Sequence, residues 1–309
     1  MTLEPSVFPQ DNAASQNFNP NLATRYKIDQ IFKIISWVST FAGLVVLALL
    51  LFDVLIDGVP RLSWQFLTSF PSRKAENAGV YSALMGTIWL LFITAAFAFP
   101  IGVGTGVFLQ EFAPDNWFAR TIEINIANLA AVPSIIYGLL GLQVFVRILL
   151  PITGGRSVLA GGLTLALLVL PVIIVATREA LKAVPDSLRL AGMALGSTRW
   201  QVVREHILPQ ALPGIMTGTI LALSRAIGET APLIVIGAQT FVPFIPPLSL
   251  EGFHSSFSAL PIQIFNWVSR PQAAFHANSA AAIVVLMVVL LLMNATAIYL
   301  RNKFQTGRA

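Results

Sequence analysis

Two side chains of opposite charge lie four residues apart inside an apolar stretch of this sequence. Arg225 and Glu229 both fall within the predicted membrane span Gly214–Ala238. An arginine at the centre of a membrane helix costs on the order of 2.5–3.5 kcal/mol on insertion scales, so a partner must offset that cost. A spacing of four places both groups on one helix face, where they can pair. A buried ion pair that only fixes packing is one interpretation.

Binding of an anion is the second interpretation of the same residues. Arginine presents a planar fork of donors that matches the oxygens of phosphate. Glu229 would orient that fork, and the hydroxyls of Thr230 and Ser224 would add donors. Ionisable residues inside membrane spans usually mark substrate pathways. The predicted substrate-path residues are therefore Arg225, Glu229, Thr230 and Ser224, none of them catalytic.

The elements that must position these residues are membrane helices, because 56% of the 309 residues are hydrophobic and only 11% are charged. Six apolar stretches approach or exceed the roughly 20 residues needed to cross the hydrocarbon core. The sequence thus predicts an all-α, polytopic membrane protein with six transmembrane helices. The predicted spans are Ile31–Ile56, Val80–Leu109, Ile122–Val146, Ser157–Thr177, Gly214–Ala238 and Ala277–Leu300.

The distribution of basic residues predicts the orientation of these spans. Of the 19 Lys and Arg, twelve lie on the side that holds both termini, six lie on the other side, and Arg225 lies within a span. Basic loops face the cytoplasm, so both termini are expected there. Residues 1–30 are predicted to be a disordered cytoplasmic tail, 31–300 a single permease domain, and 301–309 a short cytoplasmic tail. Cysteine is absent.

The Arg-rich connection Arg178–Pro213 carries two helix signals on the predicted cytoplasmic side. The first helix runs from Pro185 to Gly196, where glycine suits the residue just past a helix end. The second begins at Thr198, which with Gln201 three residues later forms a capping box. From the pattern alone, this hairpin either seals the membrane surface or docks a partner.

The spacing in this connection resembles the EAA loop of ABC importer permeases, the coupling helix that docks on the ATP-hydrolysing subunit. The sequence departs from the family pattern because Leu190 and Gly192 replace Glu and the second Ala, and His206 replaces Ile. An ion pair from that Glu to the ATPase is therefore unavailable. The resemblance assigns ATPase coupling to Leu190, Ala191, Gly196, Trp200, Leu208 and Pro209.

Longer strings resemble the A-type permease family of Pst phosphate importers (PstA), from about Val80 to Leu300. They are Asn128–Leu139, Arg178–Leu181, Leu208–Ile215, Leu223–Pro232 and Leu260–Trp267, of which the last favours the A type over the C type. The resemblance implies a type I (MetI-like) permease bundle that imports inorganic phosphate across the bacterial inner membrane. It also implies four kinds of partner: an ATP-binding subunit in two copies, a C-type permease, an extracytoplasmic phosphate-binding protein and membrane lipid.

The chain itself carries no nucleotide-binding loop, so ATP and Mg²⁺ are expected on the partner subunit only. The run Gly102–Gly106 has no preceding strand and no following Lys-Ser/Thr, and close helix packing explains it better. The three histidines have no metal-site spacing, and no nucleic-acid partner is expected. A permease for another oxyanion or nutrient, a secondary transporter and a structural membrane protein remain alternatives.

Overall fold

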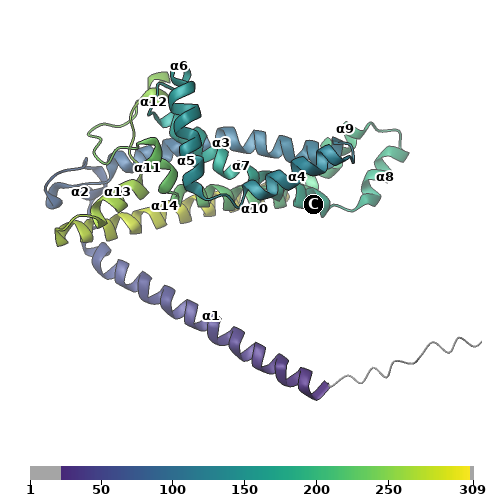
Figure 1. Cartoon of the computed structure of the whole chain (residues 1–309), viewed down its shortest axis with the longest axis horizontal. Helices are drawn as coiled ribbons and strands as arrows, with labels where there is room; N and C mark the ends of the chain where they lie inside the picture. Colours follow the sequence, from purple (N-terminus) through teal and green to yellow (C-terminus); the bar gives the residue numbers. More distant parts are fainter. Residues whose placement is uncertain (1–21, 307–309) are drawn as a thin grey trace, which may run out of the picture. The chain divides into compact units, whose positions relative to one another are not determined.

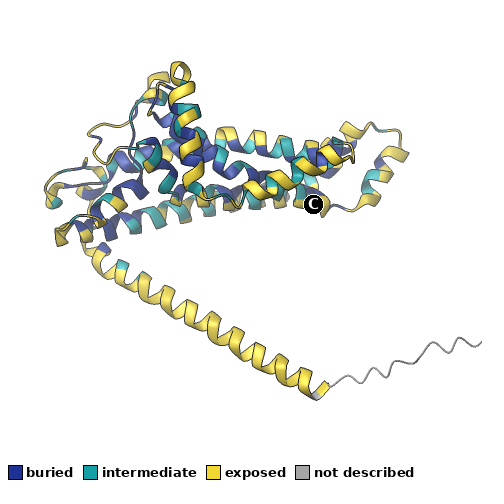
Figure 2. Cartoon of the chain, viewed as in Figure 1, coloured by how far each residue is buried: buried dark blue, intermediate teal, exposed yellow. Residues whose placement is uncertain are grey.

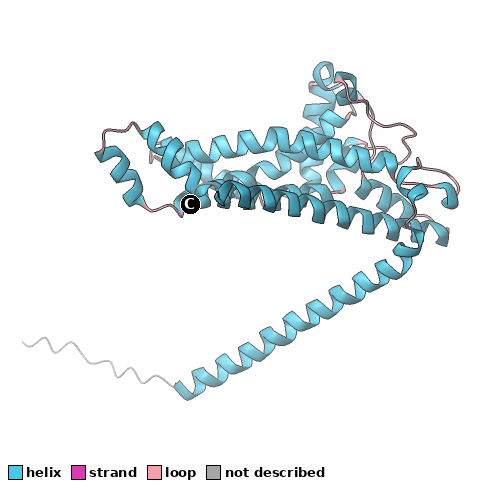
Figure 3. Cartoon of the chain, turned by 180° about the vertical axis from the view of Figure 1, so that it is seen from behind, coloured by secondary structure: helices cyan, strands magenta, loops and turns pink. Residues whose placement is uncertain are grey.

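The computed structural model of the chain describes residues 22–306, and it contains helices but no strand among those residues (Figure 3). The predicted all-α class is confirmed. Residues 1–21 and 307–309, which include most of the predicted N-terminal tail, lie outside the described range. Contacts within the chain group residues 1–53 into one unit and residues 54–309 into another. The second unit holds every residue predicted to bind substrate or the ATPase.

Five helical stretches among the described residues are long and apolar enough to cross a membrane, and a bent pair supplies a sixth. At about 1.5 Å per residue, even the shortest of the five, with 25 residues, exceeds the roughly 30 Å hydrocarbon core. The straight stretches are Thr24–Arg61, Tyr81–Phe112, Val158–Lys182, Arg199–Gly228 and Ala273–Lys303.

The first and last long helices extend beyond the predicted spans. Helix α1 (Leu22–Gly58) begins nine residues before Ile31, and α14 (Ala273–Thr306) ends six residues after Leu300. The parts of the two predicted tails within residues 22–30 and 301–306 are therefore helical, which corrects those limits. Hydropathy locates only the apolar part of a helix, whereas the i to i−4 hydrogen bonds continue into polar flanks.

The third predicted span is not one helix, so the prediction Ile122–Val146 is wrong in shape. Helix α4 (Trp117–Leu129) meets α5 (Ser134–Gly141) and the π-helical η4 (Leu142–Ile148) at an angle of 104°. Pro133 forces the preceding residue out of the helical region. The break leaves backbone carbonyls at the end of α4 without their helical partners. One of them, Leu129 O, accepts a hydrogen bond of 2.7 Å from the Tyr137 hydroxyl.

The fifth predicted span differs at both ends. Helix α9 (Arg199–Val202), the π-helical η5 (Val203–Ile207) and α10 (Leu208–Gly228) form one continuous rod, and α11 (Ala231–Ile236) follows after a break. The predicted second surface helix is thus the start of the spanning helix. The rod stops at Gly228 because the ring of Pro232 would clash with that carbonyl and supplies no N–H to it.

The core of the second unit forms around α7 (Val158–Lys182), along which α3 (Tyr81–Val107) and α10 both pack. Small residues allow the close approach of α3 to α7. A Cβ on Gly106 would lie 2.6 Å from Thr177 Cβ, and one on Gly102 would lie 2.7 Å from Ile173 Cγ2. The close packing predicted for the Gly102–Gly106 run is confirmed.

Short elements lie at the two ends of this bundle (Figure 1). One end, here called the α8 end, carries α8 (Asp186–Ala194) and α9, beside the π-helical η3 (Phe108–Phe112) that closes α3. The other end carries η1 (Val59–Arg61), α2 (Trp64–Thr68), η2 (Ala75–Asn77), α6 (Leu150–Thr153), α12 (Leu250–His254) and α13 (Leu260–Val268).

Candidate functional site

Arg225 lies in the last turn of α10 and makes one polar side-chain contact among the described residues. Its Nε donates to Glu229 Oε1 at 3.3 Å. The Arg225 side chain is 49% exposed, whereas the Glu229 side chain is 18% exposed. The predicted pair therefore forms, and the rest of the guanidinium fork is left available for a ligand.

The pair does not share one helix face as predicted. Glu229 is the residue that follows α10, with an extended ψ of 118°, and its own N–H bonds to Ala226 O. Two features keep the side chains together despite the end of the helix. The carboxylate folds back over one turn, and the positive charge of Arg225 sits at the helix C-terminus, where the backbone dipole favours it.

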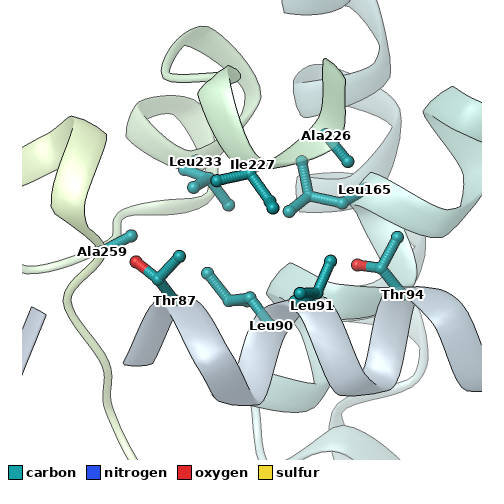
Figure 4. Close-up of a pocket in the computed structure, with 9 residues that line it drawn as sticks. All are labelled: Thr87, Leu90, Leu91, Thr94, Leu165, Ala226, Ile227, Leu233 and Ala259. Carbon is teal, nitrogen blue, oxygen red and sulfur yellow. The ribbon is translucent and has the colours of Figure 1, made fainter. Parts of the chain in front are cut away.

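The packing behind this turn fixes the direction of Arg225. Ala226 and Ile227 point toward α3, opposite Leu90 and Thr94, around a cavity of about 10 Å³, near the room of one water molecule (Figure 4). Ala226 and Ile227 are buried here. Because adjacent helical residues point about 100° apart, this burial turns Arg225 to the exposed side of α10.

The two predicted hydroxyl residues lie beside the pair but differ in their contacts. Ser224 Oγ lies 2.7 Å from Ile220 O and 2.6 Å from Asn294 Oδ1, so its single hydrogen serves acceptors inside the bundle. Thr230 precedes α11 and gives that helix no side-chain cap. The role of both in the substrate path stays a prediction, and Asn294 on α14 joins the site from a part of the chain that the motif did not indicate.

The coupling residues form a hairpin, here called the α8–α9 hairpin (Asp186–Val202). Gly196 adopts the left-handed conformation, with φ at +81°, that the turn requires. The capping box is confirmed, because Thr198 Oγ1 accepts from Gln201 N while Gln201 Oε1 accepts from Thr198 N. Gly192, a departure from the family pattern, lets the two arms approach, since a Cβ there would lie 2.7 Å from Val202 Cγ2.

Most of the hairpin is open to solvent, as the yellow and teal of α8 show (Figure 2). Leu195 is 87% exposed, Leu190 is 65% exposed and Trp200 is 56% exposed. Ala191 is also exposed, whereas Leu208 and Pro209 are half-buried at the start of α10. The predicted coupling residues therefore lie in two places, on the exposed surface of the hairpin and at the start of α10.

One ion pair at the α8 end was not predicted. Arg189 on α8 binds Glu111 in η3 through two hydrogen bonds, Nη2 to Oε1 at 2.6 Å and Nε to Oε2 at 3.2 Å. The hydrogen bonds that Arg189 donates to Glu111 raise the pKa of Arg189, an effect that burial opposes. Because the pKa of Arg189 is raised in the folded state, its contribution to stability is fully present below the pKa of the unfolded state. This contribution is lost only as the pH rises through the pKa of the folded state, far above neutrality. Arg189 therefore stays charged in a cell.

Metal ligation has no support within residues 22–306, where no group of three His, Asp or Glu side chains could hold an ion. Two of the histidines contact backbone carbonyls instead. His254 Nε2 lies 2.8 Å from Ile152 O, and His276 Nε2 lies 2.8 Å from Arg270 O.

Comparison with known proteins identifies the architecture. Residues 98–304 match the family model of the binding-protein-dependent transport system inner membrane component. The probable ABC transporter permease YqgI of Bacillus subtilis is 37% identical over 213 residues, covering 69% of this chain and 70% of that protein. The phosphate transport system permease PstA of Haemophilus influenzae is 31% identical over 237 residues, covering 77% and 80%.

A solved structure supports the same fold at low sequence identity. It belongs to a bacterial ABC transporter involved in the import of the acidic polysaccharide alginate, and it matches with a TM-score of 0.63 at 16% identity. The match covers 91% of this chain and 98% of that chain. The family assignment rules out the secondary transporter and the structural protein as readings of the sequence. The chain therefore belongs to the binding-protein-dependent transport system inner membrane components, a family of multi-pass membrane permeases.

Proposed function

We propose that this chain is the A-type permease subunit of a bacterial importer for inorganic phosphate, driven by ATP hydrolysis on separate subunits. The observation that carries the proposal is the half-exposed guanidinium of Arg225 inside a membrane-spanning helix. Such a charge is costly in lipid. A pathway for a divalent oxyanion gives it a partner that matches the donor fork.

Relatives narrow the solute to phosphate. The Pst-like string Leu223–Pro232 contains Arg225 and Glu229. The relative from Haemophilus influenzae is named as a phosphate transport system permease. Ser224 and Thr230 flank the charged pair and would supply further donors. A permease for another oxyanion would use the same fork, so competition between oxyanions is part of the test.

The α8–α9 hairpin is the docking surface for the ATP-binding subunit in this proposal. Leu190, Leu195 and Trp200 each expose a large apolar side chain on the hairpin, which suits a groove on a partner protein better than water. ATP and Mg²⁺ would bind to that partner, in two copies. The hairpin then lies in the cytoplasm together with both chain termini, in agreement with the excess of basic residues on that side.

The remaining partners complete the transport path. A C-type permease would supply the other half of the pathway and face the exposed side of α10. A phosphate-binding protein would deliver the solute to the opposite end of the bundle, where α12 and α13 lie. Lipid would cover the other apolar helices.

Phosphate uptake by a strain that lacks its own PstA permease tests the proposal. Expression of this chain together with its partner genes should restore uptake of labelled phosphate, and the ATP-binding subunit should copurify with it. Excess sulfate should not compete, whereas arsenate, which has the same shape and charge, should. Restored uptake of a different solute would reject phosphate but keep the permease, and absence of the ATP-binding subunit would reject both.

A further inference from the structure

Two consecutive residues at the end of α3 contact both arms of the α8–α9 hairpin. Glu111 and Phe112 are the last residues of η3, a π-helical turn. Such turns in otherwise α-helical segments often occur at functional sites. Neighbouring residues on a helix point about 100° apart, so adjacent side chains can reach two separate arms.

Glu111 contacts the first arm, α8, through Arg189. The Glu111 side chain is 5% exposed and holds the arginine in the two-bond arrangement described above. The other donors of Arg189 reach the end of α7, at Leu181 O (2.9 Å) and Val184 O (2.8 Å). One arginine thus joins α8, α7 and the end of α3.

Phe112 contacts the second arm, α9. Its ring centroid lies 6.1 Å from that of Trp200, and the Arg199 guanidinium lies over the ring at 5.6 Å. The aromatic and cation–π contacts are attractive in this range. Because Glu111 and Phe112 belong to one turn, both arms of the hairpin contact the same point at the end of α3.

Helix α3 leads from this point to the turn that carries Arg225. From Glu111 to Thr94 the helix covers about 25 Å at 1.5 Å per residue. Thr94 and Leu90 line a cavity together with Ala226 and Ile227, the two residues that follow Arg225 in the chain (Figure 4). A single helix therefore joins the hairpin to the packing that sets the direction of the arginine.

We propose that Glu111 and Phe112 are positioning residues that link the hairpin to α3, so that movement driven by the ATP-binding subunit reaches the substrate path. This inference rests on the proposed function, because the hairpin is taken as the docking surface. It assigns to the end of α3 a role in coupling.

Spin labels measure the linkage directly, because the chain contains no cysteine. Labels at Ser187→Cys on α8 and Ile101→Cys on α3, both exposed positions, report the distance between the hairpin and the helix in the full chain in lipid nanodiscs. The parental background should give a narrow distance distribution. Glu111→Gln, which keeps the size but removes the charge, should broaden it, and Phe112→Leu should broaden it less.

The assembled importer gives the functional readout. With Glu111→Gln, stimulation of ATP hydrolysis by the phosphate-loaded binding protein should fall at least tenfold, while the ATP-binding subunit still copurifies. The matched control is Asp186→Asn, which removes the other carboxylate on Arg189, at 3.0 Å but 91% exposed. In this control, the stimulation of ATP hydrolysis and the width of the distance distribution should each change by less than about twofold, because solvent-exposed ion pairs contribute little to stability.

The inference would be overturned if both Glu111→Gln and Phe112→Leu kept a narrow distance distribution and the parental stimulation of ATP hydrolysis. If Glu111→Gln does not accumulate, Phe112→Leu alone decides by the same two readouts. The failure of the proposed function looks different. In that case the parental chain binds no ATP-binding subunit, yet the distance measurement on the chain alone still tests the linkage.

Discussion

Two of the arginine–glutamate pairs among the described residues, Arg189 with Glu111 and Arg225 with Glu229, are built in opposite ways. Arg189 and Glu111 lie 78 positions apart in the chain, share two hydrogen bonds and are largely shielded from solvent. Arg225 and Glu229 lie four positions apart, share one hydrogen bond of 3.3 Å, and leave half of the arginine exposed. The first arginine also donates to two backbone carbonyls.

The difference separates a structural arginine from one available to a ligand. A guanidinium has five N–H donors, and Arg189 uses its fork on a carboxylate and on helix-end carbonyls. It can bind nothing further without breaking these contacts. Arg225 keeps the greater part of its fork free. Both residues are charged, so charge alone does not distinguish them, whereas the hydrogen-bond contacts do.

The largest expected effect sharpens the comparison at Arg225. Arg225→Gln should reduce phosphate uptake by about 100-fold or more, because it removes the anion partner and leaves Glu229 as an unpaired charge. Arg225→Lys should reduce uptake by roughly tenfold, because an ammonium lacks the fork. Uptake in cells and abundance in membranes measure the two effects separately, and abundance should stay parental.

The double variant Arg225→Gln with Glu229→Gln is the control for a pair that only fixes packing. Removal of both partners of a buried pair is often nearly neutral. Parental uptake by the double variant would therefore reject the role of Arg225 in the substrate path.

Arg189→Lys tests the structural role of Arg189, and it should lower stability as well as uptake. A lysine keeps the charge but cannot bond Glu111 and two carbonyls at once. We expect lower thermal stability of the purified chain and about tenfold lower uptake. A protein with parental stability and selective loss of phosphate affinity would show that the two arginines do not differ as described.

Gly196→Val should produce a smaller effect at the hairpin. No atom lies within 4 Å of a Cβ built at this position, so the cost comes from the left-handed backbone and not from a clash. That cost is about 1–2 kcal/mol for a residue with a side chain. Stimulation of ATP hydrolysis in the assembled importer should fall several-fold, and Gly196→Asn should retain most of it, because asparagine tolerates this conformation.

Thr198→Ala should have the smallest effect. The substitution removes the side chain that accepts from Gln201 N at the start of α9, which costs about 1 kcal/mol at a helix N-terminus. Thr198→Ser, which keeps the hydroxyl, is the matched control. Hydrogen exchange of the α9 amides should increase in the alanine variant alone, with uptake within about twofold of the parental chain.

The sequence by itself determined features whose causes lie within a few residues. Apolar stretches determined the spanning helices, Thr198 and Gln201 determined the start of α9, and Gly196 determined the turn. The contact between Arg225 and Glu229 was also predicted from their spacing, although Glu229 lies beyond the end of α10. Helix hydrogen bonds, caps and glycine conformations depend on neighbours in the chain, so the sequence pattern was sufficient for them.

Only the tertiary structure decided what lies beyond that range. The pairing of Glu111 with Arg189 and the 49% exposure of Arg225 depend on how distant helices pack. A charge is structural or available according to the groups around it, and those groups come from α3, α7 and α8, which the fold alone brings together.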